Sequence, residues 1–359
     1  MSDHDSQKKE NINTEKTGSS ADFKPVNFQK QTCIAPSLKA FRESSCESWT
    51  IGDLSEESSS AATPDSKYGI LSWAVAHLAN SPAACAMLKE AEKENWSFAL
   101  ESLGGPDFHL DVPEKLIVLD NQDLMTGALG RSEYFKNAVL VSMIRALRDV
   151  WQEKRHGAFD IQYGPEAVLM LERIRAADLD ILAVLVGWEL RGEGKGSLWR
   201  HLIGSEDGDI AMRFSGFLER DPSSLFNGKA LAAAFTQWFR NDRRVDSCDH
   251  EVLNYLDDIV ECSNSCQESF GCKKLTPVGA ETLSCLPDKT AYLQGQGREI
   301  IGNPLYTGLT DPINQAHFMQ IMYDLKVVRV QSVPFRDARL AEMIFPGGEF
   351  TADDEDVIH

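Results

Sequence analysis

The sequence lacks any apolar run that approaches the ~20 residues needed to cross a bilayer. Its first ten residues, MSDHDSQKKE, lack the apolar core of a secretory signal. Eight cysteines in 359 residues are too dilute for a secreted disulfide scaffold, so we expect most of them to be reduced thiols. These absences predict a cytoplasmic protein that does not associate with membranes.

Positive charge is also scarce, because the formal net charge is -19 and no local basic patch interrupts it. A chain of this charge is repelled by nucleic acid phosphates and by anionic lipid. We therefore expect no nucleic acid partner. The hydrophobic content of 42% is sufficient for a sizeable core, which predicts a globular protein.

Composition divides the chain into five segments. Residues 1–66 are rich in Ser, Lys, Glu and Asp and hold few apolar clusters, so they cannot bury enough surface to offset the entropy of ordering. We predict a disordered N-terminal tail there. The remaining segments are one domain over 67–260, a cysteine-containing insertion or loop over 261–290, the C-terminal part of the same domain over 291–346, and an acidic tail over 347–359.

The pattern of the domain is α+β. Two strand-like segments, WSFALESL at 96–103 and KLIVLD at 115–120, are separated by a connection whose Gly and Pro residues indicate turns. A long amphipathic helix follows at 137–157, and a second helix spans 165–194. Residues 182–186 are apolar on all sides, which predicts that the second helix runs through the centre of a mainly helical domain. The expected fold is a small antiparallel sheet that precedes a long central helix.

Four segments resemble a known family when they are read together. They are ALRDVWQ at 146–152, GPEAVLMLERIRAAD at 164–178, GWEL at 187–190 and ALAAAFTQWF at 230–239. Their order and spacing are similar to a bacterial family of inferred metallopeptidases of unknown function. Its pattern is a helix with HELRHAWQ, a second helix with EADA, then WELR and a late AFxxWF segment. The resemblance covers roughly residues 80–260 and implies a zincin-like fold.

The family pattern implies a zinc site. Two histidines at i and i+4 of one helix reach the same ion, and the glutamate between them acts as general base on the zinc-bound water. A third ligand comes from a neighbouring helix. In this sequence Arg145 and Asp149 stand at the two histidine positions, Ala146 at the general base and Ala176 at the third ligand.

These substitutions predict that the zinc site is lost. The guanidinium of Arg145 has no lone pair to donate and would repel a divalent ion. We expect Arg145 to form an ion pair with Asp149 on the same helix, or with Asp178 on the next, and so to replace the metal as a tie between helices. The alternative is an active metal-dependent hydrolase whose ligands are Asp149, Asp178 or Asp180 with a distant histidine, His201 or His250.

Further candidate sites are weaker. Four cysteines, Cys262, Cys266, Cys272 and Cys285, have irregular spacing that allows a zinc loop or a local disulfide, but incidental cysteines are the favoured interpretation. Glu153 and His156 form one ExxH, whereas a di-iron bundle needs two. Cys248 and His250 lie close in sequence, yet their spacing alone does not nominate a nucleophile and base.

The sequence therefore predicts a metallopeptidase-like protein without catalytic activity or cofactor, which binds a protein or peptide through the former substrate cleft. One alternative is an active zinc-dependent peptidase with non-standard ligands. Another is a scaffold or exported effector that uses its N-terminal tail for docking.

Overall fold

The computed structural model describes residues 47–56, 65–124, 129–156, 162–266, 273–325, 328–330, 333–335 and 343, with side chains left out at 261–266 and beyond 325 except at 343. The strands are β1 Trp49–Thr50, β2 Ser97–Glu101, β3 Phe108–Asp111, β4 Leu116–Asp120, β5 Val328–Val330 and β6 Val333–Phe335. The helices are α2 Ile51–Glu56, α3 Lys67–Leu78, α4 Pro82–Lys93, α5 Glu133–His156, α6 Pro165–Gly192, α7 Ser197–Ile203, α8 Gly208–Arg220, α9 Lys229–Trp238, α10 Asp242–Cys266, α11 Pro277–Thr282, α12 Gly297–Gly302, α13 Pro304–Thr307 and α14 Pro312–Asp324.

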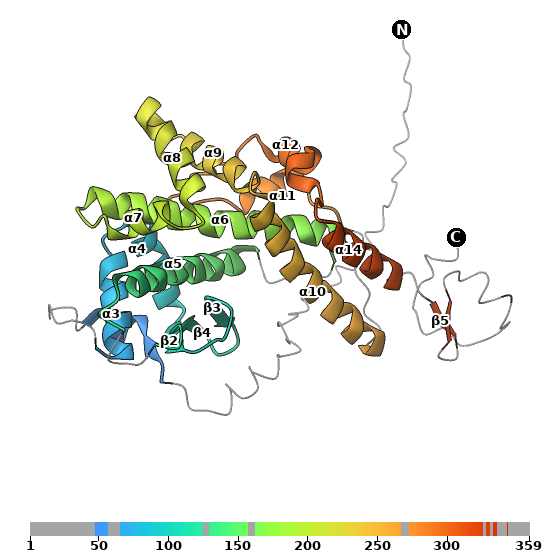
Figure 1. Cartoon of the computed structure of the whole chain (residues 1–359), viewed down its shortest axis with the longest axis horizontal. Helices are drawn as coiled ribbons and strands as arrows, with labels where there is room; N and C mark the ends of the chain where they lie inside the picture. Colours follow the sequence, from blue (N-terminus) through green and yellow to red (C-terminus); the bar gives the residue numbers. More distant parts are fainter. Residues whose placement is uncertain are drawn as a thin grey trace, which may run out of the picture.

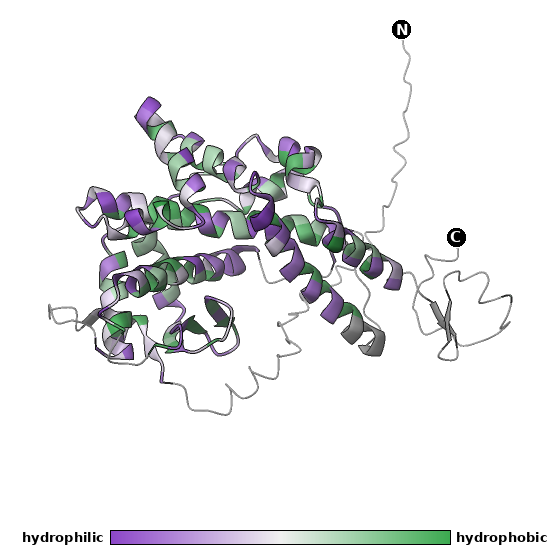
Figure 2. Ribbon diagram, viewed as in Figure 1, coloured by the Kyte–Doolittle hydropathy of each residue, from purple (hydrophilic) through white to green (hydrophobic). Residues whose placement is uncertain are grey.

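Helix α6 occupies the centre of the molecule, as its sequence predicted. Figure 1 shows α5 along one side of α6 and α8 and α9 on the other, while α7 lies at its C-terminal end. Residues 182–186 of α6 are all buried. The hydrophobic colouring is concentrated in α6 and its neighbours, whereas α10 is predominantly polar (Figure 2). This arrangement surrounds α6 with other helices, which explains why its middle is apolar on every side.

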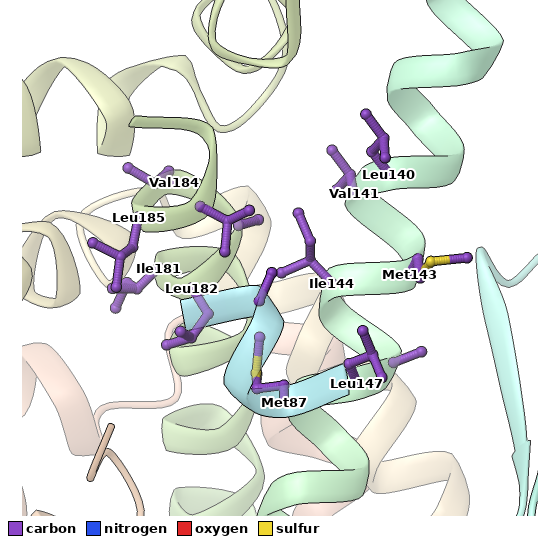
Figure 3. Packing of buried hydrophobic residues seen from close by; sticks show 14 of the residues in the cluster. Met87, Leu140, Val141, Met143, Ile144, Leu147, Ile181, Leu182, Val184 and Leu185 are labelled. Carbon is purple, nitrogen blue, oxygen red and sulfur yellow. The ribbon is translucent and has the colours of Figure 1, made fainter. Parts of the chain in front are cut away.

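The main core lies between α4, α5 and α6. Figure 3 shows Ile144 and Leu147 of α5 directed toward Met87 of α4, with Ile181 and Leu182 of α6 beside them. These five side chains are at most 1% exposed. Their spacing on α5 and α6 matches the helical period, so one face of each helix supplies the interface.

The small sheet precedes α5 as expected, and the α+β class is confirmed. Its strand order is β1-β2-β4-β3, with β2 parallel to β4 and the outer pairs antiparallel. The prediction of a purely antiparallel sheet is therefore wrong. The connection that contains the Gly and Pro residues includes a further strand, β3, whose Leu110 is buried and pairs with Ile117 of β4. This extra strand lies outside β4 and lets the two predicted strands run in the same direction.

The domain begins earlier than residue 67. Strand β1 pairs Trp49 with Phe98, and Ile51 and Leu54 of α2 are buried in the main core. The hydroxyl of Ser72 donates to the carbonyl of Leu54 at 2.8 Å. The prediction of a disordered tail through residue 66 is thus wrong for 47–56, because two buried apolar residues are too short a pattern to indicate an element. The remainder of that tail lies outside the described residues, except for 65 and 66.

The expected insertion at 261–290 is also partly wrong. Ala280, Leu283 and Leu286 belong to the main core, so residues 273–290 are an integral part of the domain. Helix α14 packs on α10 through a second small core that includes Leu253, Leu256 and Ile321. The acidic tail at 347–359 lies outside the described residues. Within the described part of the chain, no helix combines the length and apolar character of a membrane span.

The GWEL segment connects α6 to its neighbours. A Cβ atom on Gly187 would approach Leu202 of α7 to 2.6 Å, so glycine permits this close contact. Trp188 packs edge-to-face on Trp199, with ring centroids 5.2 Å apart. The carboxylate of Glu189 accepts hydrogen bonds from the Ser81 hydroxyl and from the amide of Ala83 at the start of α4. These residues therefore hold α4 and α7 against the central helix.

We predict that Leu54→Ala lowers the free energy of unfolding by about 2 to 5 kcal/mol, because it leaves a cavity in the main core. Lys89→Ala is the control, since Lys89 is exposed on α4, and it should change stability by less than about 0.5 kcal/mol. Urea unfolding of the full chain measures both. Equal stability of the two variants would show that α2 is not part of the core.

Candidate functional site

A pocket of about 790 Å³ lies where α5, α6, α7, α9 and α10 meet. This volume is within the range of about 300 to 1,000 Å³ that is typical of ligand sites. Its lining consists of Asp107, Gln122, Tyr134, Ala138, Val141, Ser142, Arg145, Ala176, Asp180, His201, Ser205, Glu206, Asp207, Trp238, Asn241, Arg243, Arg244, Ser247, Cys248 and Glu251.

One face of α5 forms part of the wall. Ala138, Val141, Ser142 and Arg145 recur at i, i+3, i+4 and i+7, which is the spacing of residues on one side of a helix. The next residue of this series is Asp149, and it does not line the pocket. The pocket therefore lies over the N-terminal and middle turns of α5.

Arg145 is held by three carboxylates. Its Nε donates to Asp180 of α6 at 2.8 Å, its Nη1 to Asp107 at 3.1 Å and its Nη2 to Asp207 at 2.9 Å. Asp107 directly precedes β3, and Asp207 directly precedes α8. Asp180 also accepts a hydrogen bond from Trp238 Nε1 at 2.8 Å. We call Arg145, Asp107, Asp180 and Asp207 the Arg145 cluster.

Burial and charge set the protonation states of this cluster. Burial alone would lower the pKa of Arg145, but the negative charges of Asp180, Asp207 and Asp107 raise it, so the guanidinium stays protonated. Burial, and then repulsion from Asp180, raise the pKa of Asp207 to about 6, although the charge of Arg145 acts in the opposite direction. The cluster thus contains more negative charge than Arg145 neutralises.

The predicted partners of Arg145 are wrong. Asp149 instead binds Arg175 of α6 at 2.9 Å, and Asp178 binds Arg148 of α5 at 2.6 Å. Arg145 does form an ion pair between the two helices, but its partner on α6 is Asp180. The rotation of each helix selects these partners, and sequence separation does not reveal that rotation.

Residues that carry the family resemblance form a second, fully buried network. One oxygen of Asp178 accepts hydrogen bonds from Arg148 and Gln152, and the other accepts one from the hydroxyl of Tyr292 at 2.6 Å. Arg148 also donates to the carbonyl of Cys285 at 3.0 Å. Breaking one side of a buried charge pair is strongly destabilising, so this network ties α5, α6 and the segment around Tyr292 together, although Arg148 Nη1 and Gln152 Oε1 have no partner among the described residues.

The four residues that the sequence resemblance assigned to the zinc site do not fit a zinc ion. Arg145 presents a protonated guanidinium to the pocket, and Ala176 lines the pocket without a donor atom. Asp149 forms its ion pair with Arg175 away from the pocket lining, and Ala146 is fully buried in the main core. Zinc binds thiolate, imidazole and carboxylate ligands, and these four positions offer no such set.

The alternative ligands are not brought together. His201 lines the pocket and contacts the ring of Tyr134, and burial followed by the charge of Arg145 lowers its pKa. His250 is exposed on α10 and does not line the pocket. Asp178 is fully buried in the second network. Among the described residues, no three His, Cys, Asp or Glu side chains are grouped as a metal site.

The other sequence candidates contribute no chemistry that the structure supports. Cys248 lines the pocket, but burial and the charge of Asp249 raise the pKa of its thiol, which disfavours the nucleophilic thiolate. Cys285 lies on the segment whose backbone binds Arg148. Cys272 and the side chains of Cys262 and Cys266 are outside what the structure describes. Glu153 and His156 lie at the end of α5, away from the pocket lining.

Several pocket residues were missed by sequence reasoning. Asp107 and Asp207 are 38 and 62 residues from Arg145 and lie outside helices and strands, so no periodic pattern indicates them. Trp238 is 1% exposed and also donates a hydrogen bond to Asp180 through its indole nitrogen. Tyr134, at the rim, is 67% exposed and preceded the predicted start of its helix.

Comparison with known proteins identifies the family. The family model described as "Putative metallopeptidase family (DUF6782)" matches residues 58–293, about two thirds of the chain. The chain therefore belongs to this family, which confirms the resemblance seen in the sequence. No curated protein and no solved structure matches the chain. The zincin-like character of the fold stays a prediction.

The raised pKa of Asp207 predicts a pH-dependent stability. Because the folded-state pKa of about 6 exceeds the ordinary value of 3.8, this carboxyl stabilises the fold below pH 4 and loses that contribution as the pH rises to about 6. Asp207→Asn removes the effect. Relative to the unchanged protein, its free energy of unfolding should therefore rise between pH 4 and pH 7, by up to about 3 kcal/mol.

Asp209→Asn is a control of opposite sign. Burial raises the pKa of Asp209, but hydrogen bonds from Arg244 and Gln237 outweigh it, and the net pKa is lowered. Asp209 therefore stabilises the fold above its ordinary pKa of 3.8 and loses this contribution as the pH falls. Urea unfolding from about pH 3 to pH 7 should give slopes of opposite sign for the two variants relative to the unchanged protein, with the Asp209 effect near and below its ordinary pKa of 3.8 and the Asp207 effect between 3.8 and about 6. Parallel slopes would contradict the assigned charge state of Asp207.

Arg145 should be required for stability because it neutralises three carboxylates. Arg145→Met is expected to cost about 3 kcal/mol or more, whereas Arg145→Met with Asp180→Asn and Asp207→Asn should recover most of the loss. Arg243→Met is the matched control, since Arg243 is exposed in the same pocket and forms no ion pair with the described residues. Denaturant unfolding compares the three. If Arg145→Met were as stable as the control, Arg145 would not be the tie between the helices.

Proposed function

We propose that this member of the family has lost the zinc site and uses the pocket to bind a polypeptide segment without cleaving it. The observation that carries the proposal is the position of Arg145, at the first histidine of the family pattern and at the centre of three carboxylates. A protonated guanidinium cannot ligate zinc, and its charge opposes a cation there.

Loss of hydrolysis follows from the residues that would perform it. Peptide hydrolysis by this family's mechanism needs a general base beside an activated water, and Ala146 has no acid-base group. The buried thiol of Cys248 has a raised pKa, so it does not offer a substitute nucleophile. The retained fold and the changed chemistry together support binding rather than cleavage.

The pocket keeps the features of a binding site. Its lining combines an exposed tyrosine, Tyr134, with polar side chains such as Ser142, Asn241 and Ser247 that offer hydrogen bonds to a peptide backbone. Tyrosine is enriched at protein interfaces because its ring buries a large area while its hydroxyl stays hydrogen-bonded. The buried Asp178 network ties α5 to α6, the two helices that supply Arg145 and Asp180 to the lining, and fixed walls lower the entropy lost on binding.

A peptide library displayed on phage and selected against the full chain tests this function. Ala138→Trp should weaken the selected peptides by at least about tenfold, because the new ring fills part of the pocket. Met212→Trp is the control, since Met212 is exposed on α8 and does not line the pocket. Mass spectrometry of each bound peptide, with and without added zinc, should recover it intact.

Other outcomes would support the alternatives. Cleavage that depends on added zinc would overturn the proposal in favour of an active peptidase with non-standard ligands. Binding that persists in Ala138→Trp but disappears when residues 1–46 are removed would favour a scaffold that docks through its N-terminal tail. If no selected peptide distinguished Ala138→Trp from Met212→Trp, the pocket would not be the binding site.

A further inference from the structure

We propose that the pocket selects a peptide with a lysine or arginine side chain, whose cationic end binds beside Asp207 within the Arg145 cluster. This inference rests on the proposed peptide-binding function and specifies what the pocket recognises.

The lining carries an excess of negative charge. Beyond the three aspartates that surround Arg145, the pocket includes the carboxylates of Glu206 and Glu251. Arg244 also lines it, but its charge is engaged by Asp209, which lies outside the lining, at 2.8 Å. Arg243 is the remaining guanidinium of the lining. The cations present do not balance the carboxylates, so the pocket attracts a positively charged ligand.

Asp207 offers the most specific contact. Its side chain is only 9% exposed, and one of its oxygens, Oδ2, accepts the hydrogen bond from Arg145. The other oxygen, Oδ1, receives no hydrogen bond from any side chain or amide in the described ranges, although Asp207 lines the pocket. Oδ1 is not one of the fully buried side-chain atoms that lack a partner, so it is open to the pocket. A ligand N–H group could therefore reach Oδ1 and donate a hydrogen bond to it.

The electrostatics of the cluster agree with this contact. Burial and the nearby charge of Asp180 raise the pKa of the Asp207 carboxyl, because both make its ionised form less stable. A bound ammonium or guanidinium would stabilise the ionised carboxylate. The same carboxylate is unsuited to an anionic ligand, which would add to the repulsion.

The rim favours a cation at the end of an aliphatic stem. Tyr134 is 67% exposed, and its ring meets His201 edge-on at 5.1 Å between centroids. A long side chain could lie along the tyrosine while its charged end reached the carboxylates, since aromatic faces attract cations and pack against methylenes. A bare metal ion fits less well, because Arg145 occupies the centre of the carboxylates and cannot act as a ligand.

Peptides that bind in a manner sensitive to Ala138→Trp provide the first test. Replacing their Lys with norleucine, or their Arg with citrulline, should weaken binding by about tenfold or more at one position, because these replacements keep the stem and remove the charge. Glu251→Gln and Asp207→Asn should each weaken the charged peptide and leave the neutral analogue nearly unchanged. Glu219→Gln, at an exposed site on α8 outside the lining, is the control.

A second measurement does not depend on the selected peptides. The pKa of Asp207, followed by carbon NMR of the full chain, should fall when Nα-acetyl-lysine amide is added, because a nearby cation stabilises the carboxylate. Nα-acetyl-norleucine amide should leave it unchanged.

The two proposals fail in different ways. Pocket-dependent peptides that tolerate every charge-removing replacement, together with an unchanged pKa of Asp207, would overturn the charge selection and leave the binding function intact. If no pocket-dependent peptide is found, the binding function fails. In that case a pKa of Asp207 that is insensitive to the lysine amide would overturn the charge selection as well.

Discussion

Three arginine–aspartate pairs join α5 to α6, and the pocket and the core are both arranged around them. In order along α5 they are Arg145 with Asp180, Arg148 with Asp178, and Asp149 with Arg175. Charges removed from water cost several kcal/mol unless their partners are well placed, so a pair broken on one side is strongly destabilising. This requirement fixes how α5 and α6 are rotated and shifted relative to each other.

That fixed rotation gives α5 two distinct faces. Arg148 and Gln152 turn inward and both donate to Asp178, whose other oxygen accepts from Tyr292, while Arg148 Nη1 and Gln152 Oε1 stay without a partner among the described residues. Arg145 turns toward the pocket, where it meets carboxylates from three separate segments. The first face holds the domain together, and the second can change its chemistry while the domain persists. Under the proposed function, this separation is what lets the fold persist without a zinc site.

The sequence predicted the parts of this structure that depend on periodic patterns. The central position of α6, the presence of α5 and the family were all correctly inferred, because long helices have a strong hydrophobic period and the family segments keep their order. The short elements β1, α2 and β3 were missed, since they contribute at most two buried apolar residues each, and β1 contributes none. The strands β1 and β3 are stabilised by pairing with β2 and β4, and α2 by packing on α3 and α4, rather than by a local signal.

The candidate site was predicted less completely for a related reason. Of the four residues that the resemblance assigned to the zinc site, Arg145 and Ala176 line the pocket, whereas Ala146 and Asp149 do not. The ion pairs of Arg145 and Asp149 were not predicted correctly, because an interface between two helices can satisfy an arginine better than a residue on its own exposed surface. Asp107 and Asp207 enter the site from loops, and only the tertiary fold brings them to Arg145.

The proposed function requires that the chain binds no zinc, because Arg145 stands at the position that the sequence resemblance assigns to a zinc ligand. This requirement is tested most directly by elemental analysis of the full chain, purified without chelator and with Cys262, Cys266, Cys272 and Cys285 changed to serine, which removes competing thiols. The account predicts a folded protein with far less than one zinc per chain, and no rise after dialysis against zinc. A folded protein with about one tightly bound zinc per chain would contradict it.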